Sequence, residues 1–100
     1  MIYRVIYTRS FRERIHAHVD YLLAEKVSNQ TISNWYDQLL LLLDSLDDTP
    51  KRFPIDERMS EETGSLTRKV NYGNYLVFYM VDDEDRTVQI IEFMHGAKRK

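Results

Sequence analysis

The sequence predicts an α+β domain in which one strand and two helices precede three further strands, in the order β-α-α-β-β-β. Two stretches of the first half repeat apolar residues every three or four positions, as amphipathic helices do. The last third holds three segments rich in β-branched and aromatic residues, separated by turn signals. Together they predict a mainly antiparallel four-stranded sheet with a two-helix hairpin on one face. The 100 residues are expected to form one domain, 1–100.

The first two elements are a strand and a helix. Residues 2–8 are mostly β-branched or aromatic and predict the first strand. Ser10 stands three residues before Glu13, the spacing at which a hydroxyl caps a helix and a carboxylate returns the hydrogen bond. The helix is therefore expected to begin there and to end near Lys26. Its apolar stripe consists of Phe11, Ile15, Val19 and Leu22.

The second helix is expected to be capped by Ser28 or Asn29. Its buried stripe consists of Ile32, Trp35, Tyr36, Leu39, Leu43 and Leu46. The five consecutive leucines at 39–43 exceed what one stripe needs, so both the first helix and the sheet are expected to cover this helix. The short link between the two helices predicts an antiparallel helical hairpin.

Residues 47–64 are predicted to form a long loop. Pro50 and Pro54 prevent the second helix from continuing, and the stretch is mostly polar. A loop of this length is either a functional or mobile segment, or a surface excursion held in place by Phe53. The sequence leaves both interpretations open.

Three strands are expected at roughly residues 65–72, 75–82 and 86–95, joined by Gly73-Asn74 and by the acidic turn 82–85. The stretch 75–81 is apolar on both alternating faces. Because the helical hairpin can cover only one face, the other face is expected to be exposed and to bind a partner. That face would carry either the alternate set Leu76, Phe78 and Met80 or the set Tyr75, Val77, Tyr79 and Val81.

Composition narrows the function class. The chain has no cysteine, which excludes disulfides and thiolate chemistry and suits the cytoplasm. No run of residues approaches the roughly 20 apolar residues of a membrane span, and no export signal is recognised, so we expect a soluble cytoplasmic protein without a membrane partner. The net charge of −2 argues against a surface that binds nucleic acid throughout.

No cofactor or metal is expected. The sequence has no Gly-rich phosphate loop and no nucleophile elbow, and it contains three glycines in all. His16 and Asp20 lie one helical turn apart, but two exposed ligands make a weak metal site. His18 is expected to project from another side of the helix, off the apolar stripe.

A cationic cluster is expected at one end of the sheet, where neighbouring strands lie only about 4.8 Å apart. Its members would be Arg68, Lys69, His95, Lys98 and Arg99. Such a cluster could stabilise phosphate charge and move protons during RNA cleavage. It could equally recognise an acidic protein surface, or contribute only to solubility.

The chain resembles the RelE/ParE superfamily of toxins from bacterial toxin–antitoxin modules. The resemblance rests on the order of degenerate motifs: Tyr3-Arg-Val-Ile-Tyr-Thr8 before a helix, Leu66-Thr-Arg-Lys-Val70, Gly73-Asn-Tyr-Leu-Val-Phe-Tyr-Met-Val81, Val88-Gln-Ile-Ile and His95-Gly-Ala-Lys-Arg99. It covers the whole chain. It implies a toxin of a type II, plasmid-stabilising module that a cognate antitoxin neutralises within a hetero-oligomer.

Two targets follow from the resemblance. RelE-like members cleave mRNA on the ribosome, which would make Arg68 and His95 catalytic; ParE-like members poison DNA gyrase without being nucleases. In either case Lys69, Lys98, Arg99 and Lys100 would bind the target or its phosphates. The antitoxin is expected to bind Tyr75, Val77 and Tyr79.

Three departures favour the ParE-like interpretation. The tail lacks a tyrosine, His95 is followed directly by Gly96, and the net charge is acidic where ribosome-dependent nucleases are strongly basic. The alternatives are a RelE-like endonuclease and a non-toxic interaction module.

Overall fold

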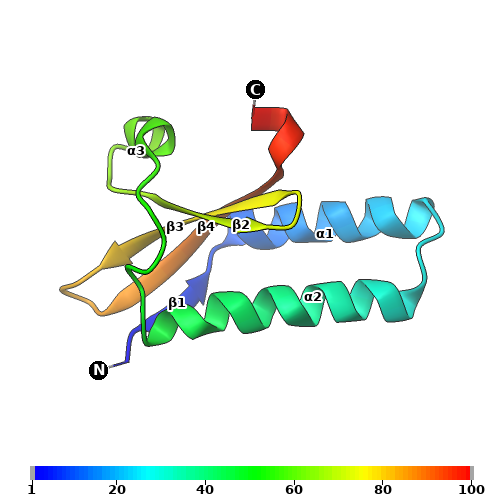
Figure 1. The fold of residues 1–100 in the computed structure, drawn as a ribbon, viewed down its shortest axis with the longest axis horizontal. Helices are drawn as coiled ribbons and strands as arrows, with labels where there is room; N and C mark the ends of the chain where they lie inside the picture. Colours follow the sequence, from blue (N-terminus) through cyan, green and yellow to red (C-terminus); the bar gives the residue numbers. More distant parts are fainter. Residues whose placement is uncertain (1, 100) are drawn as a thin grey trace.

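The computed structural model describes residues 2–99. It confirms the predicted order of elements and adds a short third helix (Figure 1). The elements are β1 (Arg4–Tyr7), α1 (Arg9–Ala24), α2 (Asn29–Asp44), the 3₁₀ helix η1 (Ser45–Asp47), α3 (Glu57–Thr63), β2 (Arg68–Tyr72), β3 (Tyr75–Asp82), β4 (Thr87–His95) and the 3₁₀ helix η2 (Gly96–Arg99).

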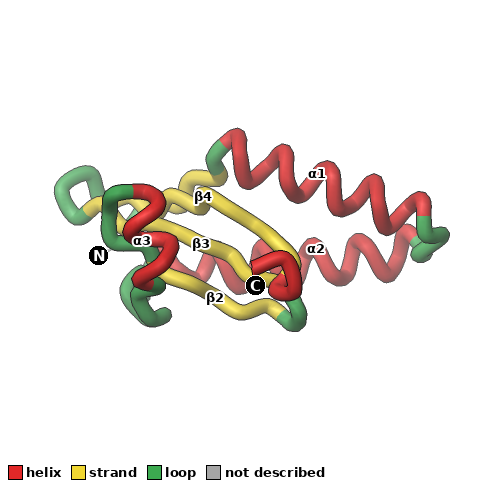
Figure 2. The backbone as a smooth tube through the Cα atoms, turned by 90° about the horizontal axis from the view of Figure 1, so that it is seen from above, coloured by secondary structure: helices red, strands yellow, loops and turns green. Residues whose placement is uncertain are grey.

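The four strands form one sheet in the order β1-β4-β3-β2. β1 is parallel to β4, whereas β2–β3 and β3–β4 are antiparallel, so the prediction of a mainly antiparallel sheet is confirmed. The α1–α2 hairpin lies on one side of the sheet and extends beyond its end (Figure 1). Seen from above, β2, β3 and β4 run between α3 and the C-terminal η2 (Figure 2).

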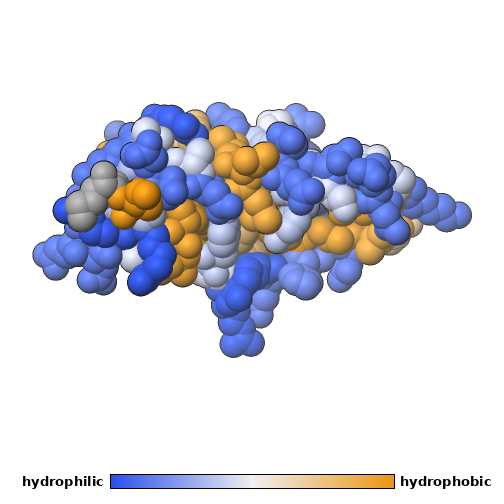
Figure 3. All heavy atoms as spheres, turned by 90° about the horizontal axis from the view of Figure 1, so that it is seen from below, coloured by the Kyte–Doolittle hydropathy of each residue, from blue (hydrophilic) through white to orange (hydrophobic). Residues whose placement is uncertain are grey.

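The core lies between the sheet and the helical hairpin. Its buried members are Phe11, Ile15, Leu39, Leu43, Leu46, Val70, Val77, Tyr79, Val88, Ile90 and Phe93. The leucine run is covered on one side only: Leu39 and Leu43 are 0% exposed, but Leu41 is 65% exposed. Tyr36, expected in the buried stripe, is exposed as well. The helical side therefore keeps apolar patches among its charged residues (Figure 3).

Helix α1 is capped by Thr8 and not by Ser10. The Thr8 hydroxyl accepts a hydrogen bond from the Phe11 N–H at 3.3 Å and donates one to the Ile90 carbonyl at 2.7 Å. This second bond ties the cap to β4, which explains why Thr8 takes the role and Ser10 lies inside the helix. The predicted cap Ser28 of α2 is confirmed, with its hydroxyl 3.1 Å from the Thr31 N–H.

The predicted loop at 47–64 contains helix α3. Asp56 caps this helix by accepting a hydrogen bond from the Met59 N–H at 2.9 Å. Gly64 ends it with φ of 79°, a left-handed conformation that glycine adopts without steric cost. The helix has seven residues and buries only Met59, so it leaves no apolar period for the sequence to reveal.

The second face of the sheet is partly covered. Phe78 lies on this face and is 0% exposed. The guanidinium of Arg99, from η2, sits 5.0 Å from the centre of the Phe78 ring. The expectation of an open second face is therefore wrong around Phe78, because η2 folds back over it. Leu76 and Met80, on the same face, are half-buried.

A β-bulge interrupts the pairing of β3 with β4. Phe78 pairs with Glu92 and Tyr79 with Ile90, which leaves Ile91 without a partner. The extra residue shifts the alternation of side chains along β4 by one position. Ile90 and Phe93, which are three residues apart, therefore both point into the core. The end of β4 beyond the bulge is the part that builds the candidate site.

Candidate functional site

An aromatic cluster fills the space between the helices and the outer end of β3 and β4. The His18 ring lies 5.3 Å from Trp35, 4.8 Å from Tyr75 and 5.5 Å from Phe93, measured between ring centres. Tyr75 and Phe93 stack on each other at 5.2 Å. Each ring comes from a different element, so the cluster fixes the hairpin against the sheet.

His18 is the member that the sequence analysis misplaced. It follows Phe11 by seven residues and Ile15 by three, a spacing that puts all three on one helix face. Its Nε2 atom is buried and has no hydrogen-bond partner among the described residues. Burial lowers the pKa of His18, and the nearby His95 and Lys98 lower it further, which favours the neutral form of the imidazole.

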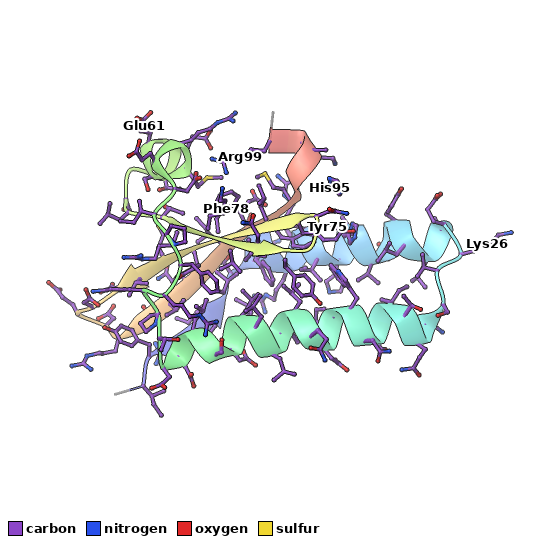
Figure 4. The ribbon with its side chains drawn as sticks, viewed as in Figure 1. Lys26, Glu61, Tyr75, Phe78, His95 and Arg99 are labelled. Carbon is purple, nitrogen blue, oxygen red and sulfur yellow. The ribbon has the colours of Figure 1, made fainter. Side chains whose placement is uncertain are left out.

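A groove of about 420 Å³ opens beside this cluster, between α1 and the end of β4. Its lining residues are Arg14, Ala17, His18, Tyr21, Phe93, Met94, His95 and Lys98. The His95 Nδ1 accepts a hydrogen bond from the Ala97 N–H at 3.1 Å, so a neutral His95 carries its proton on Nε2. Figure 4 shows His95 and Tyr75 together at this end of the sheet.

The predicted catalytic pair does not come together. Arg68 pairs with Tyr79 and His95 with Tyr75, so the two lie on either side of β3 and four residues apart along it, about 13 Å in the strand direction at roughly 3.3 Å per residue. The Arg68 guanidinium instead donates hydrogen bonds to the carbonyls of Lys51, at 3.2 Å, and Phe53, at 2.7 Å. Arg68 thus anchors the segment that precedes α3.

Two of the predicted target-binding cations are bound internally. Arg99 donates a hydrogen bond to the Asp56 carboxylate, and the Lys69 ammonium lies 3.9 Å from the same carboxylate. Burial alone would raise the pKa of Asp56, but the hydrogen bonds from Arg99 and the Met59 N–H, with the two cationic charges, hold it below its ordinary value. Lys98 remains exposed in the groove, and Lys100 lies outside the described residues.

The residues expected to bind an antitoxin face the helices. Val77 and Tyr79 are 0% exposed and belong to the core, and the Tyr79 hydroxyl donates to the Pro50 carbonyl at 2.7 Å. The α1–α2 hairpin covers both side chains, so antitoxin contact at these two residues stays a prediction that their burial opposes. Tyr75, at the end of the strand, is half-buried in the aromatic cluster.

Residues 2–99 contain no group of three histidine, cysteine, aspartate or glutamate side chains placed to hold a metal ion. His16 and Asp20 are both exposed on α1. None of the helices in this part of the chain combines the length and apolar character needed to cross a membrane.

The comparisons with known proteins agree with this fold. The family model described as "ParE toxin of type II toxin-antitoxin system, parDE" matches residues 5–99. No curated protein sequence gives a match. Among solved structures, the toxin–antitoxin complex RelBE2 from Mycobacterium tuberculosis contains a similar chain, with a TM-score of 0.62 and 21% identity. The similarity covers 95% of this chain and 99% of that one. The chain belongs to the family of ParE toxins of type II toxin–antitoxin systems.

Proposed function

We propose that this chain is a toxin that inhibits DNA gyrase in the cytoplasm without cutting RNA, and that a cognate antitoxin neutralises it. The observation that carries the proposal is the placement of Arg68. Its guanidinium donates hydrogen bonds to two backbone carbonyls. Along the strand direction, the backbone of Arg68 lies four residues, or about 13 Å, from that of His95.

RNA cleavage needs a proton carrier and a phosphate-stabilising cation within hydrogen-bond reach of one scissile phosphate. Because the Arg68 guanidinium is held by the carbonyls of Lys51 and Phe53, and its backbone lies four strand positions from His95, this arrangement opposes a phosphate shared by the two. The cation Arg99 is neutralised by Asp56, and the chain carries a net charge of −2, which disfavours docking among ribosomal phosphates. A gyrase inhibitor needs only a binding surface, so these features do not oppose it.

A second candidate function is cleavage of mRNA on the ribosome. It is favoured by the groove, where His95 and Lys98 lie beside Arg14 and could serve as proton carrier and phosphate ligands. In this function the catalytic set would consist of groove residues and would exclude Arg68. The third alternative, a non-toxic interaction module, would keep the antitoxin partner and lose the effect on growth.

Induced expression in a bacterial host tests the proposal. We expect growth arrest with the original chain, with His95→Ala and with Arg68→Ala, because a gyrase inhibitor uses neither side chain for chemistry. Circular dichroism of each purified variant establishes that it is folded. Loss of toxicity in a folded His95→Ala variant, together with discrete cuts in translated mRNA, would favour the nuclease. A folded chain that never affects growth would favour the third alternative, the non-toxic interaction module.

A further inference from the structure

The end of β4 has a free edge. Strand β1 pairs with β4 only as far as Tyr7 opposite Ile90, so beyond that point no strand within residues 2–99 pairs with β4 on this side. The bulge at Ile91 lies at the same place. The groove between α1 and β4 runs along this free edge.

The backbone of Phe93 and His95 faces this edge. The Gly96 N–H donates to the Asn74 carbonyl at 2.8 Å, so Gly96 faces β3 and His95, one residue earlier, faces away from it. Phe93, two residues before His95, faces the same way. The Phe93 N–H donates a hydrogen bond at 3.0 Å to the carboxylate of the adjacent Glu92, because no strand within residues 2–99 lies at this edge to accept it.

The groove beside the edge combines cationic side chains with apolar surface. Arg14 and Lys98 bring positive charge to its lining beside His95, and within residues 2–99 no carboxylate belongs to that lining. Glu92 lies next to it, 3.3 Å from the Arg14 guanidinium. Tyr21, which is 58% exposed, and the ring of Phe93 supply the apolar surface. The volume of about 420 Å³ falls within the ~300–1,000 Å³ of ordinary ligand sites.

We propose that this groove binds an extended acidic segment of the antitoxin. The segment would pair its backbone with the free edge at Phe93 and His95, place carboxylates near Lys98 and Arg14, and lay an apolar side chain on Tyr21. Backbone pairing gives affinity and the alternate side chains give specificity, as in other strand additions to a sheet edge. The inference rests on the proposed function, since it requires an antitoxin.

A peptide fits this surface better than a nucleic acid does. A strand edge offers paired backbone donors and acceptors, which a peptide matches and a nucleic acid does not.

The test uses nuclear magnetic resonance with a synthetic probe, a six-residue peptide that alternates glutamate with leucine. Titration into the ¹⁵N-labelled chain is expected to shift the amide signals of residues 92–98 and 14–21 in a saturable way. The same peptide with alternate N-methylated amides, which cannot donate along the edge, is expected to bind about tenfold more weakly. Lysine in place of glutamate is expected to abolish binding.

Charge variants complete the test. Lys98→Glu is expected to weaken the probe about tenfold, whereas Lys26→Glu, at the exposed turn between α1 and α2, should leave its affinity within about twofold. Figure 4 shows Lys26 at the far end of the hairpin. No saturable shift, shifts confined to other residues, or equal weakening by both variants would overturn the inference. So would a ten-residue oligothymidine that binds the groove more tightly than the peptide.

This outcome is independent of toxicity. If the chain arrests growth but does not bind the probe at the groove, only the proposal that the groove binds the antitoxin is refuted. If the chain binds the probe but never affects growth, the proposed function is refuted and the proposed peptide site in the groove stands.

Discussion

Arg99 and Asp56, 43 residues apart, join η2 to the start of α3 across the second face of the sheet. The Arg99 side chain is 18% exposed and the Asp56 side chain 11%. The same guanidinium stacks over Phe78, and the Arg99 carbonyl accepts a hydrogen bond from Arg58 at 2.7 Å. The segment Gly96–Arg99 is thus part of the folded domain, whereas the sequence analysis assigned Arg99 to binding of the target.

Replacement of Arg99 by alanine should therefore destabilise the fold. Removing one partner of a largely buried charged pair leaves the Asp56 carboxylate with the more distant Lys69 ammonium and the Met59 N–H, so we expect a loss of about 1.5–3 kcal/mol in the free energy of unfolding. Urea unfolding measures it. As a control, Arg9→Ala removes the exposed pair with Glu13, whose side chains are 86% and 65% exposed, and should cost under about 1 kcal/mol. Equal effects would show that the Asp56 pair contributes nothing special.

Acid should destabilise the protein through His18. The pKa of His18 is lowered on folding, so below its ordinary value of 6.5 the unfolded chain binds a proton that the folded chain does not. The contribution of His18 to stability is complete above pH 6.5 and falls as the pH decreases toward the lowered pKa. The titratable and charged groups that face the ring are Tyr21 from α1, Tyr75 from β3, His95 from β4 and Lys98 from η2.

The measurement is the free energy of unfolding from pH 8 to pH 5, for the original chain and for His18→Phe. The variant keeps an aromatic ring that cannot titrate, so its curve is expected to be flatter in this interval. His16→Phe, two residues away on the exposed side of α1, is the control for introducing a phenylalanine into this helix. Parallel curves for the original chain and His18→Phe would contradict the assignment.

Trp35→Ala is expected to destabilise the fold by about 3 kcal/mol, as other aromatic truncations in cores do. The indole contacts the rings of His18, Tyr72, Tyr75 and Phe93. The adjacent Tyr36→Ala removes a ring that is 36% exposed and should cost about 1 kcal/mol or less. Urea midpoints for both variants decide the matter, and a reversed order would place Tyr36 in the core instead.

The two candidate caps of α1 can be separated by substitution. Thr8→Ala removes the hydroxyl that caps the helix and bonds to Ile90, so it should cost about 1–2 kcal/mol. Ser10→Ala, inside the helix, should change stability by less than about 0.5 kcal/mol, because alanine is the better helix former. Thermal unfolding of both variants provides the comparison; a larger loss for Ser10→Ala would restore the sequence-based cap.

The order and type of the main elements could be predicted because each carries a hydrophobic period of its own. Helix α3 could not, since it is short, polar and buries only Met59. Thr8 was passed over because its advantage over Ser10 comes from Ile90, 82 residues away. Long-range partners of this kind are not encoded in local spacing.

The candidate site divides in the same way. His18 could have been found, because Phe11, Ile15 and His18 share one helical face. The separation of Arg68 from His95 depends on strand register. The pairing of Lys69 and Arg99 with Asp56 depends on where α3 packs against the sheet. Neither fact could be derived from the order of residues along the chain.

The most direct test of the central claim is a supercoiling assay with purified gyrase, relaxed plasmid and ATP, run beside a translation reaction that contains a defined mRNA. The account predicts that the chain blocks supercoiling or traps cleaved plasmid, and that the mRNA stays intact. Normal supercoiling together with discrete cuts in the translated mRNA would contradict it.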